Sequence, residues 1–236
     1  MVWEAGRLEI RYDDLSKKWR VFQPVTVKSI LSSKGFKTCC IDIGVKNLGT
    51  VWVEGWGKSL AFHSGTLLRE WWYWTKKIAK HQSSLTRVNG KISETLKKPY
   101  RKRQRHFKHA VDAFARQLVG DLCELGVSKI VVGKLKHIRE NSHNSKKANS
   151  MIHNLLTAEE YGIKVREISE ASMSGRCPRC GSRKAERKGR FFRCLNCGFE
   201  AHRDAVEVLN MANLHGEGTA IGAVAHPSLL RWNGMK

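Results

Sequence analysis

Apolar and polar residues alternate along parts of the chain in short runs that predict strands, and recur every three or four positions elsewhere, which predicts helices. Residues 7–12 and 19–22 alternate around a polar turn and predict a β-hairpin. Residues 38–44 and 48–53 are two further strand-like runs joined by a short turn, and they predict a second hairpin. Because an isolated hairpin is marginal in water, we expect the first one to pair with another part of the fold.

Helical periodicity extends from residue 67 to about residue 126. Pro99 lies between the two apolar halves of this stretch, and we expect a second helix to begin there, since the first helical position tolerates proline. Residues 129–133 and 161–168 predict two more strands, the latter after a short helix, and residues 205–214 predict a final helix. Strands and helices in this order indicate an α/β layered domain.

The charge of the chain is strongly positive. Its 236 residues include 43 lysines and arginines against 21 aspartates and glutamates, a formal net charge of +22. Such an excess is typical of proteins that bind nucleic acid, although a membrane-surface protein or a ribosomal protein would share it. The sequence has no apolar run of about 18 residues and no signal peptide. We therefore expect a soluble, cytoplasmic protein with a nucleic-acid partner.

Positive charge is densest in residues 97–109, at the start of the expected second helix. This run could neutralise several phosphates at once. A solvated helix face is the alternative interpretation, but the net charge of the chain favours contact with nucleic acid. The predicted nucleic-acid site consists of Lys97, Lys98, Arg101, Lys102, Arg103, Arg105 and Lys108.

Four cysteines form two Cys-x-x-Cys pairs, which are Cys177 with Cys180 and Cys194 with Cys197. A glycine follows each pair, as in the tight turns of a zinc ribbon, so this spacing favours a tetrahedral Zn²⁺ site over redox or disulfide pairs. Four thiolates leave the ion no open position, which makes its role structural. The remaining cysteines lie in apolar stretches, and we expect buried thiols and a reducing compartment: Cys39, Cys40 and Cys123.

Asp42 ends the first apolar strand of the second hairpin, at the place where metal-dependent sheet enzymes keep carboxylates. An isolated Asp-x-Gly is also explained by the capping of a turn, which is the simpler interpretation. Asp204 opens the predicted final helix, a few residues after the last cysteine. Neither carboxylate identifies an activity by itself.

Four motifs, in this order, resemble the TnpB (OrfB) family, the transposase-associated proteins of insertion sequences that are related to the ancestors of type V CRISPR nucleases. They are residues 41–48, the strand ending near Gly133, the cysteine pairs, and residues 203–210. The resemblance spans residues 36–214. It implies an α/β, RuvC-like fold of the ribonuclease H class with a zinc-ribbon insertion. It also implies a prokaryotic, nucleoid-associated protein that acts as an RNA-guided DNA endonuclease, with a guide RNA from the end of the element and DNA as partners.

In this family three carboxylates hold two Mg²⁺ ions that hydrolyse phosphodiesters. By resemblance, Asp42 supplies the first carboxylate and Asp204 the third. The family usually has a glutamate where this chain has Gly133, and an aspartate at the next position of some relatives is replaced here by Lys134. Glu140 is the nearest acid and would reach the ions if its loop folds over the strand ends; an ordinary solvated glutamate is the alternative.

The resemblance divides the chain into four parts. Residues 1–35 are a hairpin remnant of the N-terminal lobe that full-length members carry. Residues 36–174 and 200–215 form the RuvC-like domain, and residues 175–199 form the zinc ribbon. Residues 216–236 are a glycine-rich tail that we expect to be poorly ordered. A stretch of helix that the family carries near residue 150 is also missing, so we expect a truncated copy.

Two functions follow from these expectations. The first is a Mg²⁺-dependent nuclease with Asp42, Glu140 and Asp204 as metal ligands. The second is a protein that binds RNA or DNA without catalysis, which the substitution at position 133 favours. A free-standing structural zinc protein is a third possibility, and the pairing of Asp42 with Asp204 in the family context argues against it.

Overall fold

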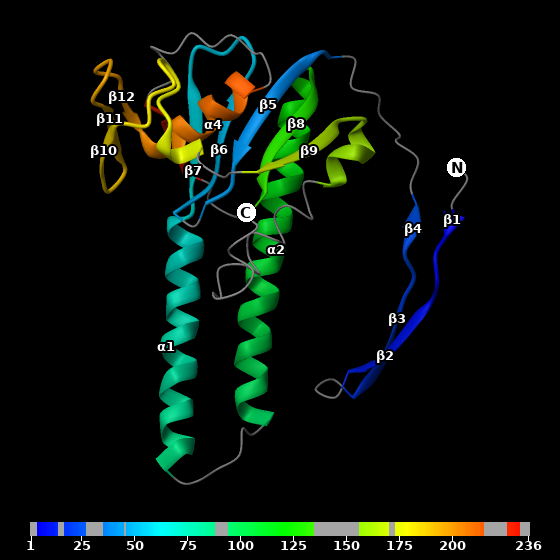
Figure 1. Ribbon diagram of the computed structural model, residues 1–236. Coiled ribbons are helices and arrows are strands. Elements are labelled where there is room, and N and C mark those ends of the chain that lie inside the picture. Colours follow the sequence, from blue (N-terminus) through cyan, green and yellow to red (C-terminus); the bar gives the residue numbers. More distant parts are fainter. Residues whose placement is uncertain are drawn as a thin grey trace.

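A six-stranded mixed sheet forms the centre of the computed structural model, which describes residues 4–13, 17–26, 35–44, 46–87, 94–134, 156–169, 173–214 and 226–231 (Figure 1). The strand order is β13-β7-β6-β5-β8-β9. Strand β6 runs antiparallel to β5 and β7, whereas β8 and β9 run parallel to β5. The strands are β5 (Lys37–Asp42), β6 (Asn47–Val53), β7 (Ser59–His63), β8 (Val127–Lys134), β9 (Lys164–Ser169) and β13 (Ser228–Arg231).

The strand predictions for this sheet are confirmed. Strands β5 and β6 form the second predicted hairpin, and β8 and β9 are the two later strands, with the 3-10 helix η1 (Leu156–Tyr161) before β9. The sixth strand was not predicted. Strand β13 pairs in parallel with β7, so the expectation of a poorly ordered tail is wrong for these residues. Main-chain hydrogen bonding to the open edge at β7 explains why so short a segment is ordered.

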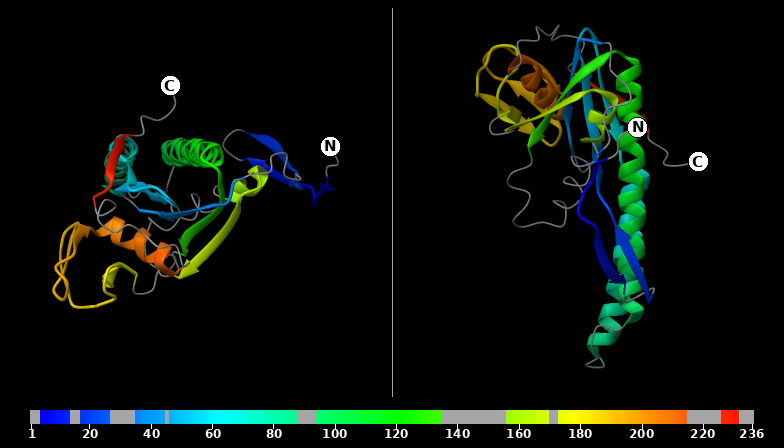
Figure 2. Two further views of the ribbon diagram at one scale, coloured as in Figure 1. Left: turned by 90° about the horizontal axis from the view of Figure 1, so that it is seen from above. Right: turned by 90° about the vertical axis from the view of Figure 1, so that its right-hand side faces the viewer.

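One face of the sheet is covered by two long helices, α1 (Gly65–Arg87) and α2 (Glu94–Glu124), which run antiparallel and extend well beyond the strands (Figures 1 and 2). Apolar residues of α2, such as Phe114 and Leu118, pack there against Ile41 and Val132. The prediction that the second helix begins at Pro99 is wrong, because α2 begins at Glu94 and includes this proline. A proline this close to the start removes at most one helical hydrogen bond, since the first four N–H groups have no partner within a helix.

The opposite face carries the helix α4 (Arg203–Leu214) and a small three-stranded sheet, as the view from above shows (Figure 2). The small sheet has the order β10-β11-β12, with strands β10 (Ala185–Lys188), β11 (Phe191–Cys194) and β12 (Glu200–His202), and the 3-10 helix η2 (Met173–Gly175) precedes it. Cys40 and Val131 of the central sheet pack there with Leu209 and Phe192. Both Cys39 and Cys40 are fully buried, as expected, and Cys123 is half-buried.

The N-terminal hairpin is present as predicted. Strand β2 (Glu9–Asp13) pairs with β3 (Lys18–Phe22), and the shorter pair of β1 (Glu4–Ala5) with β4 (Val25–Thr26) extends it. Asp13 attaches this hairpin to α2. Its buried carboxylate accepts a hydrogen bond from Arg20 Nε at 3.1 Å and is also bonded to the guanidinium of Arg101. The hairpin is therefore paired with another part of the fold, as its marginal stability required.

Candidate functional site: an acidic pocket beside a cysteine cluster

The end of β5 places Asp42 on the face of the sheet that α4 covers. Side chains alternate along a strand, so Cys40 and Asp42 point to the α4 side while Ile41 points to the α1–α2 side. The same alternation on β8 puts Gly133 on the face of Val131, toward α4. Ile41 is paired with Val132, so Gly133 is the neighbour of Asp42 on the next strand, at the ordinary strand spacing of about 4.8 Å. The missing second carboxylate would therefore stand beside Asp42.

Asp204 enters the same region from the first turn of α4. Its side chain is 8% exposed, and each carboxylate oxygen accepts a hydrogen bond. Asn47 Nδ2 donates to Oδ2 at 2.9 Å, and Arg190 Nη1 donates to Oδ1 at 2.5 Å. The bond from Asn47, at the start of β6, joins two residues that are 157 positions apart in the sequence. A carboxylate in the first turn of a helix is also stabilised by the positive end of the helix dipole.

Glu207 is a third acid of this region, which the sequence analysis did not single out. It lies one turn after Asp204 on α4, and its carboxyl group is hydrogen-bonded to that of Asp42. Burial is the main cause that raises the pKa of Glu207, against the opposing effects of that hydrogen bond and of Arg203. The Arg203 Nε is 3.7 Å from Glu207 Oε1. The i, i+3 spacing from Asp204 would have identified the residue, because such positions share one face of a helix.

Asp42, Asp204 and Glu207 are therefore a cluster of interacting carboxyl groups between the end of β5 and the first two turns of α4, which we call the acidic pocket. Glu140, the predicted second ligand, lies outside the described residues. Within the described ranges, the only three or more Asp, Glu, His or Cys residues whose ligand atoms all lie within 4.8 Å of one another are the four cysteines. The three carboxyl groups are not among such groups. A site for two ions about 3.5–4 Å apart also needs ligands that are spread more widely than those of a single ion.

The four predicted zinc ligands come together. The sulfur atoms of Cys177 and Cys197 are 3.6 Å apart, as are those of Cys180 and Cys194. Four sulfurs around one Zn²⁺ at about 2.3 Å would be about 3.8 Å apart. The cysteine cluster therefore has the dimensions of a tetrahedral zinc site.

Each cysteine pair ends in a tight turn, as the glycine that follows it predicted. Gly181 and Gly198 have φ values of +73° and +68°, in the left-handed region that favours glycine. Their N–H groups donate to the carbonyl oxygens of Cys177 at 2.9 Å and Cys194 at 3.0 Å. The pKa of the Cys180 thiol is lowered to about 6, chiefly by its hydrogen bond with the Ser182 backbone. The lowered pKa favours the thiolate form of Cys180, the form that binds metal.

The first cysteine turn is attached to α4. Asn210 Nδ2 donates hydrogen bonds to the carbonyl oxygens of Met173 at 2.6 Å and Arg176 at 2.8 Å. One turn later, Asn213 Nδ2 donates to the carbonyl oxygen of Pro178 at 2.8 Å. The helix that carries Asp204 and Glu207 is thus fixed directly to the segment that carries the first pair of cysteines.

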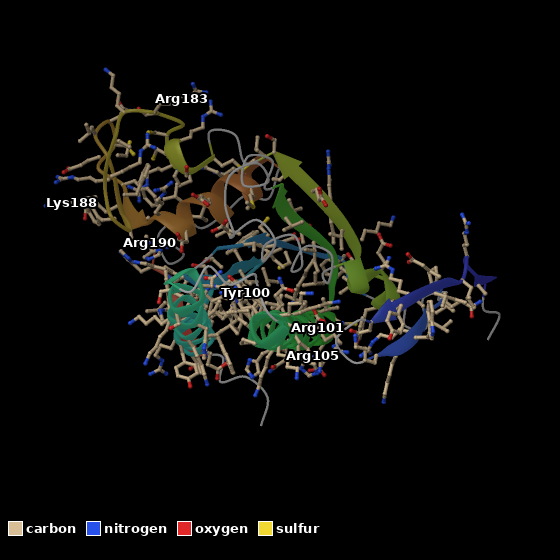
Figure 3. All side chains as sticks on the ribbon, turned by 90° about the horizontal axis from the view of Figure 1, so that it is seen from below. Tyr100, Arg101, Arg105, Arg183, Lys188 and Arg190 are labelled. Carbon is tan, nitrogen blue, oxygen red and sulfur yellow. The ribbon has the colours of Figure 1, made fainter. Side chains whose placement is uncertain are left out.

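The hairpin between β10 and β11 makes a second attachment, at the acidic pocket itself. Gly189, with φ of +61°, and Arg190 form its two-residue turn. Glycine at the first position of such a turn is typical of type II′. The carbonyl oxygen of Arg190 accepts a hydrogen bond from the Arg203 N–H at 2.8 Å, and its side chain bonds Asp204. Figure 3 shows Arg190 on the side of its hairpin that is nearer to α4. The position of this cation depends on the hairpin.

The predicted basic site lies on the far side of the central sheet, on the first part of α2, where Figure 3 labels Arg101 and Arg105. At about 100° per residue, most of its cations fall within about a third of the circumference of the helix. Arg101 bonds Asp13, and Arg103 points the other way, toward α1, where it bonds Thr75 Oγ1 at 2.9 Å. This stripe consists of Lys97, Lys98, Arg101, Arg105 and Lys108, of which all but Arg101 are exposed. Lys102 is also exposed but lies outside the stripe, over the Trp74 ring.

Aromatic side chains from α1 add to this basic surface. Trp72 and Tyr73 are each 59% exposed, and the ammonium groups of Lys77 and Lys102 lie 5.5 Å and 5.2 Å from the Trp74 ring. Cations beside exposed aromatic rings are the features on which single-stranded nucleic acids bind, since bases stack on rings and phosphates pair with cations. The paired helices α1 and α2 thus provide an aromatic and cationic surface.

Comparisons with known proteins place the chain in a family. Residues 22–139 match the family OrfB_IS605, described as a probable transposase, and residues 155–211 match the Cas12f1-like TNB domain. The TnpB-like protein ORF457 of Acidianus two-tailed virus is 28% identical over 207 residues, which is 74% of this chain and 45% of the relative.

Two solved structures share the fold. A Cas12f1 in complex with sgRNA and target DNA superposes with a TM-score of 0.58 at 17% identity, covering 87% of this chain and 55% of that protein. A CRISPR-Cas12f ternary complex gives 0.56 at 17% identity, with 87% and 45% covered. The chain thus spans about half the length of the relatives it matches.

No helix among the described residues is long and apolar enough to cross a membrane.

The family match covers half of the chain, in the part that carries Asp42 and the α1–α2 pair, and the second match covers the cysteine cluster and Asp204. The chain therefore belongs to the OrfB_IS605 family of probable transposases, the TnpB family whose motifs its sequence resembles.

Proposed function

We propose that this protein binds RNA and DNA and that its acidic pocket is a RuvC-type, Mg²⁺-dependent nuclease site in a rearranged form. One observation carries the proposal. Asp42 at the end of β5 and Asp204 at the start of α4 are connected through Glu207, which bonds the first and interacts with the second. This interaction supports a common site for Asp42 and Asp204, the two carboxylates that the family resemblance implies.

The strand order supports the ribonuclease H class. Three antiparallel strands, β7, β6 and β5, followed by the parallel β8 and β9, give an order of 3-2-1-4-5 within that part of the sheet. The first carboxylate then lies at the end of the central strand, next to the strand that carries Gly133. This is the placement that the family resemblance implies for a RuvC-like domain.

Nucleic-acid binding is supported by charge and by the relatives. The net charge of +22 and the exposed aromatic and cationic surface of α1 and α2 suit a polyanion. One of the similar structures is a complex of Cas12f1 with sgRNA and target DNA. We infer that RNA and DNA are the partners of this chain too.

Two metals follow from the donor atoms. The four thiolates suit Zn²⁺ and leave it no open position, so it would hold the two turns of the ribbon together. Carboxylate oxygens suit Mg²⁺, which binds few protein ligands and keeps several waters. In the acidic pocket, Asp42 and Asp204 would hold the ions, which activate the attacking water and stabilise the leaving oxygen when bound. The role of the protein is to hold the carboxylates and, through Arg190, to limit repulsion between them.

Nucleic-acid binding without catalysis is the second candidate, and Gly133 is the observation that favours it. A complete family site would have a carboxylate there, beside Asp42. Mg²⁺ demands near-ideal octahedral oxygen coordination and gives up its water reluctantly, so a site with only two carboxylates would hold it weakly.

One experiment tests both candidates. The protein is purified with its bound nucleic acid, the RNA is sequenced, and the complex is assayed on matching DNA with Mg²⁺ beside Asp42→Ala. Cleavage by the parent that is lost in Asp42→Ala would establish a working site. Bound RNA without cleavage by either form would establish the binding protein. A preparation that retains neither RNA nor DNA would refute the proposed function.

A further inference from the structure

We propose that Glu207 supplies the carboxylate that position 133 lacks, so that Asp42, Asp204 and Glu207 are the three acidic ligands of the divalent-cation site. This inference rests on the proposed function and identifies a residue within it. Glu140 is the residue that the sequence predicts for the same role.

The position of Glu207 is the first argument. Gly133 faces α4, so a side chain there would have pointed from β8 into the acidic pocket beside Asp42. Glu207 approaches the same place from the opposite direction, from the second turn of α4, and bonds Asp42 directly. A carboxylate on the helix can therefore replace one on the strand without any change in the backbone.

The contact between Asp42 and Glu207 is the second argument. Asp42 is 7% exposed and the Glu207 side chain is 19% exposed, so both carboxyl groups are largely shielded from water. Carboxylate oxygens are the ligands that Mg²⁺ and Mn²⁺ prefer. A divalent cation between the two groups could therefore bind an oxygen of each.

The distribution of positive charge is the third argument. Arg190 Nη1 donates a hydrogen bond to Asp204 Oδ1 at 2.5 Å. Arg203 stands 3.7 Å from Glu207, beyond hydrogen-bond distance, and its side chain is 42% exposed. Arginine therefore compensates Asp204 more closely than it compensates Glu207. A bound cation would add positive charge at Glu207, where the arginine is more distant.

The test is the binding of Mn²⁺, measured by electron paramagnetic resonance on the zinc-loaded protein. The variants are Glu207→Gln, Asp42→Asn, Glu140→Gln and, as a matched control, Glu160→Gln, an exposed acid on η1. Zinc content and thermal melting show that each variant is folded. We expect Glu207→Gln and Asp42→Asn each to weaken Mn²⁺ binding at least tenfold, and the other two to match the parent.

A rescue separates a metal ligand from a residue that only supports the fold. Adding Gly133→Glu to the Glu207→Gln variant returns a carboxylate to the pocket from the strand, and we expect it to restore Mn²⁺ binding to within about threefold of the parent. Glu207→Gln with parental Mn²⁺ affinity would overturn the inference, as would a tenfold loss in Glu140→Gln. If the parent retains RNA but binds no Mn²⁺, the inference fails while nucleic-acid binding stands.

Discussion

The basic stripe of α2 makes a quantitative prediction about salt. Replacing its four exposed cations by glutamine removes four positive charges from one helix face about 16 Å long, at a rise of 1.5 Å per residue. The residues are Lys97, Lys98, Arg105 and Lys108. Arg101 and Arg103 stay unchanged, because they bond Asp13 and Thr75 within the protein. The fold should therefore tolerate the change.

Counterion release sets the magnitude. Each phosphate that a cation neutralises contributes about 0.7 to the slope of log affinity against log salt for single strands, and about 0.9 for duplex DNA. If each of the four cations contacts one phosphate, the quadruple variant has a slope shallower by about 2.8 or about 3.6. Between 50 and 200 mM salt, the smaller value means that the parent loses about 50-fold more affinity than the variant.

The assay is fluorescence anisotropy with a labelled RNA and a labelled DNA duplex at several KCl concentrations. The control is a second quadruple variant with the same loss of charge at exposed cations in other parts of the chain. Its substitutions are Lys17→Gln, Lys58→Gln, Lys164→Gln and Arg166→Gln. Equal slopes for the two variants would show that only net charge matters and would refute the assignment of the stripe as a binding site.

Three further predictions concern the cysteine cluster and the acidic pocket. Cys177→Ser should abolish stoichiometric zinc by elemental analysis, whereas the half-buried Cys123→Ser should retain it; zinc retained in the first variant would contradict the cluster as a metal site. Asn47→Ala removes the 2.9 Å bond to the buried Asp204 carboxylate and should lower the free energy of unfolding by about 2 kcal/mol in urea titrations. The raised pKa of Glu207 means that the folded state binds the extra proton. Stability should therefore fall as pH rises from the ordinary glutamate value, about 4.3, through the raised one. Glu207→Gln should reduce this dependence in thermal melts without Mg²⁺, and identical pH profiles of the two proteins would exclude it.

Most of the central sheet was predictable because its strands are long apolar runs, which indicate buried strands. Residues 38–43, 47–53 and 130–133 are all buried, and such apolar runs are what the search for strands detects directly. Strand β13 was not predictable, since its four residues have no apolar pattern of their own and depend on the open edge at β7. Pro99 misled the placement of α2 because proline signals a helix start, whereas the helix had begun one turn earlier.

The cysteine cluster could be predicted completely, because four ligands at fixed spacing leave little choice of geometry. The acidic pocket could be predicted only in part. Asp42 and Asp204 came from family motifs, but Glu207 and Arg190 belong to the pocket through tertiary contacts with residues 14 to more than 100 positions away. Nothing in the local pattern distinguishes Arg190 from an ordinary surface charge, and the only local signal for Glu207 is its i, i+3 spacing from Asp204. Glu207 and Arg190 reach the acidic pocket only because α4 and the β10–β11 hairpin pack on that side of the sheet.

The reach of Arg190 from its hairpin turn has a consequence for the order of assembly. The hairpin lies between the two cysteine pairs in the sequence, so we expect a metal ion bound by all four sulfurs to fix its shape. Before that ion binds, Asp204 would have its bond from Asn47 but not its cation. We therefore expect the acidic pocket to acquire its charge balance after the cysteines have bound their metal.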